Sequence, residues 1–190
     1  MEEHRMTIRL LTLLLCLFTC ISPVLAEGTG GYGYGGSKSK GLSNATTNRL
    51  VRTLERGIRL CRSLDSVYRY DCYRQNYKTA ADRLEGNVAY SVPLEALRDI
   101  ERSLQTVVTL NADPTAAVVR KGGGTFRAVT PTSTARAKET FRRSLDDAAT
   151  MLLRSAEANG DHFARIAQVL DSDKVLLRAT QLQTKQKLQA

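Results

Sequence analysis

Apolar side chains recur every three or four residues through most of the chain beyond Leu42. That spacing places them on one face of an α-helix, where they bury against neighbouring helices. Residues typical of helix ends divide the pattern into about five segments, with interruptions at 63–66, 86–91, 111–132 and 159–160. The pattern therefore predicts an all-α bundle of about five helices.

The core of this bundle is expected to be aliphatic and modest in size. Hydrophobic residues make up 42% of the 190 residues, but aromatic residues only 6%, and there is no Trp. A chain of this length fits one domain, and so few aromatic residues argue against a large aromatic ligand pocket. The predicted core positions are Leu50, Val51, Leu54, Ile58, Cys61, Leu64, Tyr70, Tyr73, Tyr77, Ala80, Ala81, Leu84, Leu94, Leu97, Ile100, Leu104, Val107, Val108, Phe141, Leu145, Ala148, Leu152, Ala156, Phe163, Ile166, Ala167, Leu170 and Leu177.

Short polar side chains mark the expected helix ends. Asn44, Thr46 or Thr47 is expected to cap the first helix, because such side chains accept hydrogen bonds from free backbone N–H groups. The polar triplet at 171–173 leaves two alternatives for the last segment, which is either one helix or two.

The helical period disappears between residues 111 and 132. The stretch around Lys121 and the three glycines that follow it fits either a small β-hairpin or a mobile loop, and we expect the loop. It does not resemble a phosphate-binding loop, because its glycines follow the lysine and no strand-loop-helix unit surrounds them. The prediction is a single helical domain over 42–190 with an irregular loop at 111–132.

The N-terminal segment has the pattern of a signal peptide. Residues 10–21 form a twelve-residue apolar run that is too short to span a bilayer as a helix. Pro23 then breaks the helix, and the sequence Val24-Leu25-Ala26 predicts cleavage after Ala26. The predicted signal peptide is therefore 1–26, with translation starting at Met1 or Met6. An uncleaved anchor is the alternative, but we expect a periplasmic or secreted protein with no transmembrane segment after signal removal.

Residues 27–41 contain seven glycines in fifteen positions. So much glycine carries a large ordering entropy, which no side-chain pattern here offsets. This segment is predicted to be a flexible, Gly-rich arm.

Cys61 and Cys72 remain after signal removal, because Cys16 and Cys20 leave with the signal peptide. Two cysteines in an oxidising compartment are best interpreted as one disulfide. A disulfide needs Cα atoms within about 7 Å, whereas an unbroken helix would hold these residues about 16 Å apart. The chain must therefore turn between them, so a disulfide-stapled helical hairpin is predicted. A metal site is not expected, since His162 is the one remaining histidine.

Basic residues recur along the first predicted helix and continue into the second. Their spacing forms a stripe that we interpret as a candidate surface for an anionic partner, although an ordinary solvated face gives the same pattern. The formal net charge of +9 agrees with an anionic partner. The candidate residues are Arg49, Arg52, Arg56, Arg59, Arg62, Arg69 and Arg74.

Four tyrosines fall within ten residues of the second predicted helix, at Tyr68, Tyr70, Tyr73 and Tyr77. Together with the nearby arginines they suggest a stacking surface for an anionic or sugar ligand. The structural alternative is that Tyr70, Tyr73 and Tyr77 pack on the first helix and their hydroxyls reach the rim. Nucleic acid is not the expected partner, because an exported protein meets little of it.

No catalytic constellation can be recognised. There is no Gly-x-Ser-x-Gly elbow, and His162 is expected to be an exposed residue in a first helical turn. Glu95 with Asp99 and Asp146 with Glu157 are possible carboxylate pairs, but carboxylates at helical spacing are usually exposed partners of nearby arginines. We therefore expect no catalytic residue and no cofactor.

Three stretches carry a resemblance to a known family. They are Tyr68-Arg69-x-Asp71-Cys72 following Cys61, the segment 152–157, and Ser172-x-Lys174 with the four residues after it. They resemble a family of uncharacterised exported all-helical proteins of alphaproteobacteria. The resemblance covers about residues 47–180 and implies export and a helical fold, but no catalytic residue, because the family has no established activity. The chain departs from it at Ser66, where a proline is expected.

Two function classes follow from these features. The expected one is a non-enzymatic binding or interaction module whose partner is an envelope component or a periplasmic protein. The alternative is a hydrolase that acts on an envelope polymer through a carboxylate pair. The hydrolase predicts one acidic residue buried against apolar neighbours with a raised pKa, whereas the binding module predicts affinity that salt weakens.

Overall fold

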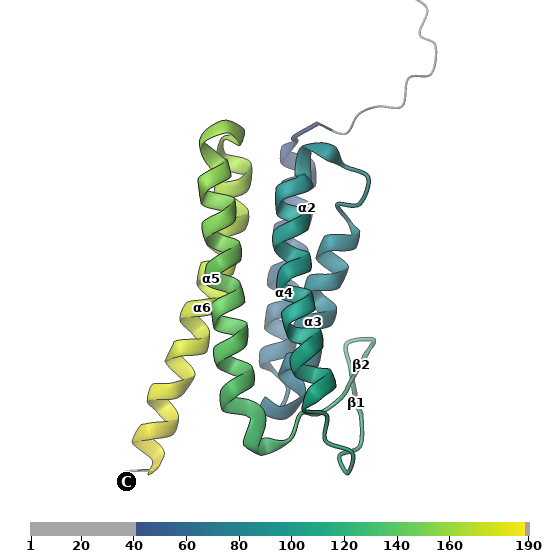
Figure 1. Ribbon diagram of the computed structural model, residues 1–190, viewed down its shortest axis with the longest axis vertical. Coiled ribbons are helices and arrows are strands. Elements are labelled where there is room, and N and C mark those ends of the chain that lie inside the picture. The colour runs from purple at the N-terminus through teal and green to yellow at the C-terminus, as the bar shows by residue number, and fades with distance from the viewer. Residues whose placement is uncertain (1–40, 189–190) are drawn as a thin grey trace, which may run out of the picture. The chain divides into compact units, whose positions relative to one another are not determined.

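The computed structural model describes residues 41–188, and the predicted signal peptide and nearly all of the Gly-rich arm lie outside them. The described residues confirm the predicted all-α bundle, and the helices belong to one compact unit. The five helices, shown in Figure 1, are α2 (Asn44–Arg62), α3 (Ser66–Asp82), α4 (Ser91–Leu110), α5 (Thr134–Asn159) and α6 (Asp161–Leu188). Short 3-10 turns at Val88–Tyr90 and Pro131–Ser133 precede α4 and α5.

The helices form a closed ring of contacts in chain order. Each helix packs against the next one, and α6 packs against α2. Consecutive helices run in opposite directions (Figure 1), so an odd number of them leaves α2 and α6 parallel. The first turns of these two helices accordingly meet, with Arg165 of α6 hydrogen-bonded to Asn44 and Asn48 of α2. We call this parallel contact the α2–α6 seam.

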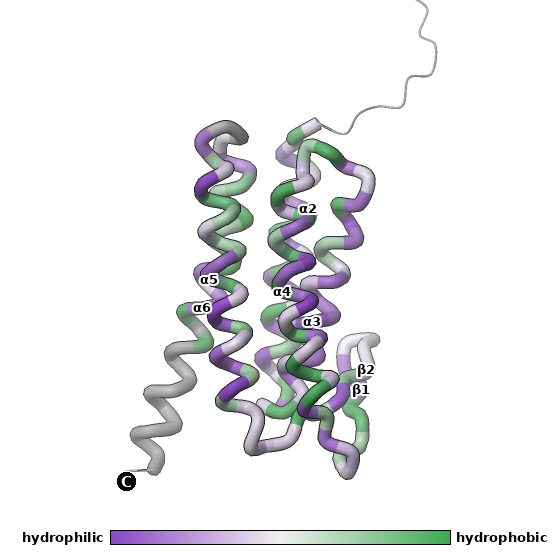
Figure 2. Tube along the Cα trace, viewed as in Figure 1, coloured by the Kyte–Doolittle hydropathy of each residue, from purple (hydrophilic) through white to green (hydrophobic). Residues whose placement is uncertain are grey.

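The ring encloses the aliphatic core that the sequence predicts. Nearly all predicted core positions are buried, and only Val51, Leu94, Ala156 and Leu177 are half-buried. Apolar and polar residues alternate along every helix, as Figure 2 shows by hydropathy, because each helix presents one face to the core. At its centre the ring of Tyr73 packs on that of Phe141, with 4.6 Å between the ring centroids.

Two expectations about helix ends are resolved. The cap of α2 is Ser43, whose Oγ accepts a hydrogen bond from the backbone N–H of Thr46 at 3.2 Å. Asn44, Thr46 and Thr47 lie inside the helix, so the predicted cap is wrong by one residue. The 171–173 triplet does not divide the last segment, since α6 is continuous through it.

The predicted disulfide joins Cys61 at the end of α2 to Cys72 in α3, with 5.4 Å between the Cα atoms. The turn between the two helices lies at 63–65, as expected. Gly57 allows the two helices to approach closely, because a Cβ at that position would collide with the side chain of Asn76. The amide of Asn76 uses this space to donate a hydrogen bond to the backbone oxygen of Leu54 at 3.2 Å.

Removal of the disulfide is expected to destabilise the protein. The Cys61→Ala/Cys72→Ala double variant should lose about 3 kcal/mol of unfolding free energy, because the bridge restricts the unfolded chain. Urea denaturation of the oxidised protein and the double variant measures this loss. Reduced wild-type protein is the matched control and should show a similar loss, and equal stability of the oxidised and reduced forms would contradict the prediction.

The segment expected to be a mobile loop contains an ordered β-hairpin instead. Strand β1 (Val119–Lys121) pairs antiparallel with β2 (Gly124–Phe126), and Val119 lies opposite Phe126. Gly122 and Gly123 have φ of 57° and 82°, which a two-residue hairpin turn requires. Phe126 is buried, so the segment contributes to the core.

Asp71 of α3 holds this hairpin in place. Its carboxylate is almost fully buried and accepts hydrogen bonds from Nε of Arg74 at 2.8 Å and from the backbone N–H of Arg127 at 2.9 Å. Gln75 also contacts it and donates to the backbone oxygen of Thr125 at 2.8 Å. The bonds to Arg127 and Thr125 join residues about fifty positions apart in sequence, and helical spacing does not predict such contacts.

Candidate functional site

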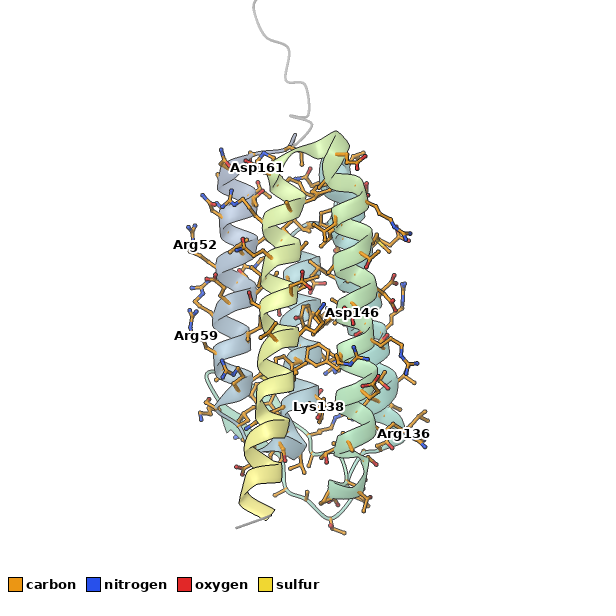
Figure 3. The ribbon with its side chains drawn as sticks, turned by 90° about the vertical axis from the view of Figure 1, so that its left-hand side faces the viewer. Arg52, Arg59, Arg136, Lys138, Asp146 and Asp161 are labelled. Carbon is orange, nitrogen blue, oxygen red and sulfur yellow. A yellow bond between two sulfur atoms is a disulfide. The ribbon has the colours of Figure 1, made fainter. Side chains whose placement is uncertain are left out.

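Arg49, Arg52, Arg56, Arg59 and Arg62 lie along the solvent side of α2, and all five are exposed. Figure 3 shows Arg52 and Arg59 pointing away from the bundle. We call these five residues the arginine face. None of them forms an ion pair with an Asp or Glu among residues 41–188, whereas Arg98, Arg142 and Lys174 each contact two carboxylates.

The two arginines of α3 do not extend this face. Arg74 forms an ion pair with Asp71 at 2.8 Å and lies 3.9 Å from Glu101, and its side chain is only 15% exposed. Arg69 is half-buried, and its Nε donates to the backbone oxygen of Leu64 at 2.8 Å. Arg69 and Arg74 are therefore not part of the arginine face, because internal partners hold both side chains.

The predicted tyrosine stacking surface is not formed. Tyr70, Tyr73 and Tyr77 are buried, and the last two pack against Phe141 of α5. Burial raises the pKa of Tyr70 to about 12, and its hydroxyl donates to the backbone oxygen of Thr134 at 3.0 Å. Tyr68 is half-buried and donates to the backbone oxygen of Ala117. These rings therefore stabilise the bundle.

Asp173 of α6 is a buried acid at the α2–α6 seam, with 1% of the residue exposed. Its Oδ2 accepts a hydrogen bond from the hydroxyl of Tyr77 at 3.1 Å, while its Oδ1 has no hydrogen-bond partner among the described residues. Desolvation raises the pKa of Asp173 to about 7, although the hydroxyls of Tyr77 and Tyr73 and the charge of Arg62 oppose the rise.

Sequence reasoning did not identify Asp173 as a site residue. One signal was present, because Ile166, Leu170 and Leu177 form a stripe at helical spacing and Asp173 falls on it. A charged residue at a core position is uncommon without a partner. The triplet 171–173 was considered only as a possible helix break, so the place of Asp173 on the apolar stripe was not considered.

A cavity of about 400 Å³ lies along the seam beside Asp173. Its apolar walls come from Val51, Ile58 and Val169, and the remaining lining residues are polar or charged: Glu55, Arg59, Arg62, Arg165, Gln168, Ser172 and Asp173. The arginine face and the buried acid thus meet at one cavity. A second, more apolar hollow of about 510 Å³ lies between α5 and α6.

His162 is half-buried rather than exposed, which corrects the expectation. Its Nδ1 lies 2.8 Å from Oγ1 of Thr47, and that oxygen lies 2.7 Å from the hydroxyl of Tyr90. Thr47 and Tyr90 are fully buried. Solvent does not reach the hydroxyl of Thr47 that the imidazole contacts. This chain of hydrogen bonds connects α2, the 3-10 turn before α4, and α6.

The two carboxylate pairs considered for a hydrolase are not buried. Glu95 and Glu157 are exposed, and Asp146 accepts hydrogen bonds from Arg142 and Lys174.

Among residues 41–188, no three His, Cys, Asp or Glu side chains are grouped so that they could hold a metal ion. Within the same range, no helix combines the length and the hydropathy that crossing a membrane requires.

The chain matches no protein-family model, no curated protein and no solved structure. The resemblance to exported alphaproteobacterial proteins therefore stays a prediction. Two features carry the functional argument: the arginine face, and the seam cavity with its buried acid.

Proposed function

We propose that the protein is an exported, non-enzymatic module that binds anionic surfaces of the cell envelope through the arginine face. One observation carries the proposal: five exposed arginines follow one helix without a carboxylate partner among the described residues. From Arg49 to Arg62 the helix rises about 20 Å, which is long enough to contact several anionic groups at once. Glu55 is the one acidic residue of α2, so four net positive charges remain on it.

Export is the second part of the proposal. The signal-peptide pattern of residues 1–26 supports it, and the Cys61–Cys72 disulfide is typical of proteins in oxidising compartments. In the envelope such a protein meets anionic lipids and polymers and little nucleic acid. A localised positive field speeds and orients encounters with those surfaces.

The test removes three arginines that lie outside the seam cavity. The variant Arg49→Gln/Arg52→Gln/Arg56→Gln should bind phosphatidylglycerol vesicles about 100-fold more weakly at low salt, since each basic residue near an anionic membrane contributes about 1 kcal/mol. Binding of the wild type should also weaken as salt rises, because exposed charges are screened over about 8 Å at physiological ionic strength. Co-sedimentation with vesicles, and with purified peptidoglycan, measures both effects.

A matched variant separates location from total charge. Arg83→Gln/Arg136→Gln/Arg154→Gln removes the same charge from exposed positions on other elements, and Arg136 lies across the bundle from Arg52 in Figure 3. We expect this control to keep most of the binding. Equal loss in both variants would show that only net charge matters, and a wild type that does not bind at low salt would contradict the proposal.

A hydrolase acting on an envelope polymer is the second candidate, and Asp173 is the observation that favours it. A buried carboxyl with a pKa raised to about 7 is suited to general acid catalysis. The other carboxylate of the cavity, Glu55, is exposed, so no pair of acids shares its buried end. Binding without turnover is therefore better supported. Release of soluble fragments from peptidoglycan by the wild type, and not by Asp173→Asn, would reverse this preference.

A further inference from the structure

The carboxyl group of Asp173 lies at the seam, and the surface binding proposed above for the arginine face gives it no role. A buried carboxyl oxygen normally has a hydrogen-bond donor, and an oxygen without one destabilises the fold. Oδ1 of Asp173 has none among the described residues, and the residue lines a cavity. This oxygen is covered in the structure, so a donor group that enters the cavity reaches it only when the side chains over it move.

The outer part of the same cavity offers the opposite charge. Arg59 and Arg62 line it and are exposed, and neither pairs with a carboxylate of the described residues. Arg62 is close enough for its charge to act on the carboxyl of Asp173. Arg165 also lines the cavity, but Asn44 and Asn48 hold its guanidinium group. Two free guanidinium groups thus lie beside one buried acceptor.

These groups favour a ligand with both signs of charge over a ligand with only one. A simple cation would meet the positive field of the arginines, and a simple anion would leave Oδ1 of Asp173 without a donor. A molecule with both an ammonium and an anionic group satisfies both ends, and the volume of about 400 Å³ falls in the range of small-molecule sites. We propose that the seam cavity binds a small zwitterion, with its ammonium group at Asp173 and its phosphate or carboxylate at Arg59 and Arg62.

The probe for this site is O-phosphoethanolamine, titrated calorimetrically into the exported protein at pH 8. Phosphocholine is the matched control, because its quaternary ammonium has the same charge but no N–H to donate. Inorganic phosphate and ethylamine each supply one half of the probe. We expect O-phosphoethanolamine to bind and the three controls to bind at least about tenfold more weakly, which is the loss expected for one charge-assisted hydrogen bond.

Variants locate the binding. Asp173→Asn and Arg59→Gln/Arg62→Gln should each weaken it about tenfold to a hundredfold. The variant Arg49→Gln/Arg52→Gln/Arg56→Gln should bind the probe like the wild type, so failure of this proposal and failure of the surface-binding proposal are distinguishable. Phosphocholine or inorganic phosphate binding as tightly as the probe, or an unaffected Asp173→Asn variant, would overturn the assignment.

Proton release gives a second readout. Ammonium binding requires the ionised carboxylate, so near neutral pH it should release a proton from Asp173, detectable as a dependence of the heat on the buffer. The charged and titratable groups that line the cavity or act on this carboxyl are Glu55, Arg59 and Arg62 of α2, Tyr73 and Tyr77 of α3, and Arg165 of α6. Vesicles with phosphatidylethanolamine, compared with phosphatidylcholine vesicles, then distinguish a lipid headgroup from a free zwitterion as the source.

Discussion

Replacement of Phe141 by alanine is expected to lower the free energy of unfolding by about 4 kcal/mol, the largest loss that we predict for one substitution. The ring is fully buried in the core of the bundle. It lies 4.6 Å from the ring of Tyr73 and 5.8 Å from that of Tyr77, measured between centroids. Alanine would leave a cavity beside both rings, and urea denaturation at one pH measures the loss.

Phe163→Ala is the matched control, because it removes an equally buried ring far from Asp173. The ring of Phe163 lies near that of another tyrosine, Tyr90, with 6.3 Å between the centroids. It lies ten residues before Asp173 on the same helix, which separates the two by about 15 Å. Both variants should be destabilised by a similar amount. The milder Phe141→Leu serves if Phe141→Ala does not fold, and a loss below about 1 kcal/mol for Phe141→Ala would contradict the prediction.

The stability of the wild type is expected to fall as pH rises from 5 to 8, and Asp173 is the cause. Its pKa is about 7 in the folded protein, against a usual value of 3.8. The folded state therefore holds a proton in this range that the unfolded state has released. The stabilisation is complete below the unfolded pKa and is lost as pH rises through 7, an effect of about 4 kcal/mol in all, of which about 2 to 3 kcal/mol falls between pH 5 and pH 8.

Asp173→Asn tests this assignment, because its amide does not ionise. Thermal or urea unfolding between pH 5 and pH 8 should show a slope for the wild type and little slope for the variant. Phe163→Ala should keep the slope, because it leaves the carboxyl of Asp173 and its hydrogen bond to Tyr77 in place. A wild type with constant stability across this range would contradict the prediction.

The effect of Asp173 on stability can be distinguished from the effects of other titrating groups. Hydrogen bonds and charges from Lys78 and Arg98 lower the pKa of Asp82, and those from Arg142 lower the pKa of Glu139. The stability that they contribute is lost only in acid, below the range of the measurement. His162→Gln is the control for the part-buried hydrogen bond of His162. The pH slope should persist in that variant.

Helical spacing predicted the parts of this fold that depend on local order. Leu50, Leu54 and Ile58 recur at three or four residues and are buried. The cysteine spacing predicted a turn, because the length of an unbroken helix excludes the bond. These inferences succeeded because each depends on residues that are close in sequence.

The site depended on contacts that local order does not report. Asp71 holds a hairpin that lies about fifty positions away in sequence. Local sequence does not show this contact, and for that reason the segment around Lys121 was expected to be mobile. Tyr70, Tyr73 and Tyr77 were placed correctly on one side of a helix, but spacing alone does not distinguish a core from a ligand surface. Asp173 meets Tyr77 across 96 positions of sequence. Such a pair is recognised only when the ring of helices is known.

The contact between the first and last helices has a kinetic consequence. Four of the five interfaces join neighbours in sequence and form early, whereas the seam joins Thr47 to His162 across 115 positions. Closing so long a loop costs about 2 kcal/mol more chain entropy than closing the eleven-residue loop of the disulfide. We therefore expect α6 to dock last during folding and to detach first when the native state opens. The cavity at Asp173 would then be the last feature of the protein to form.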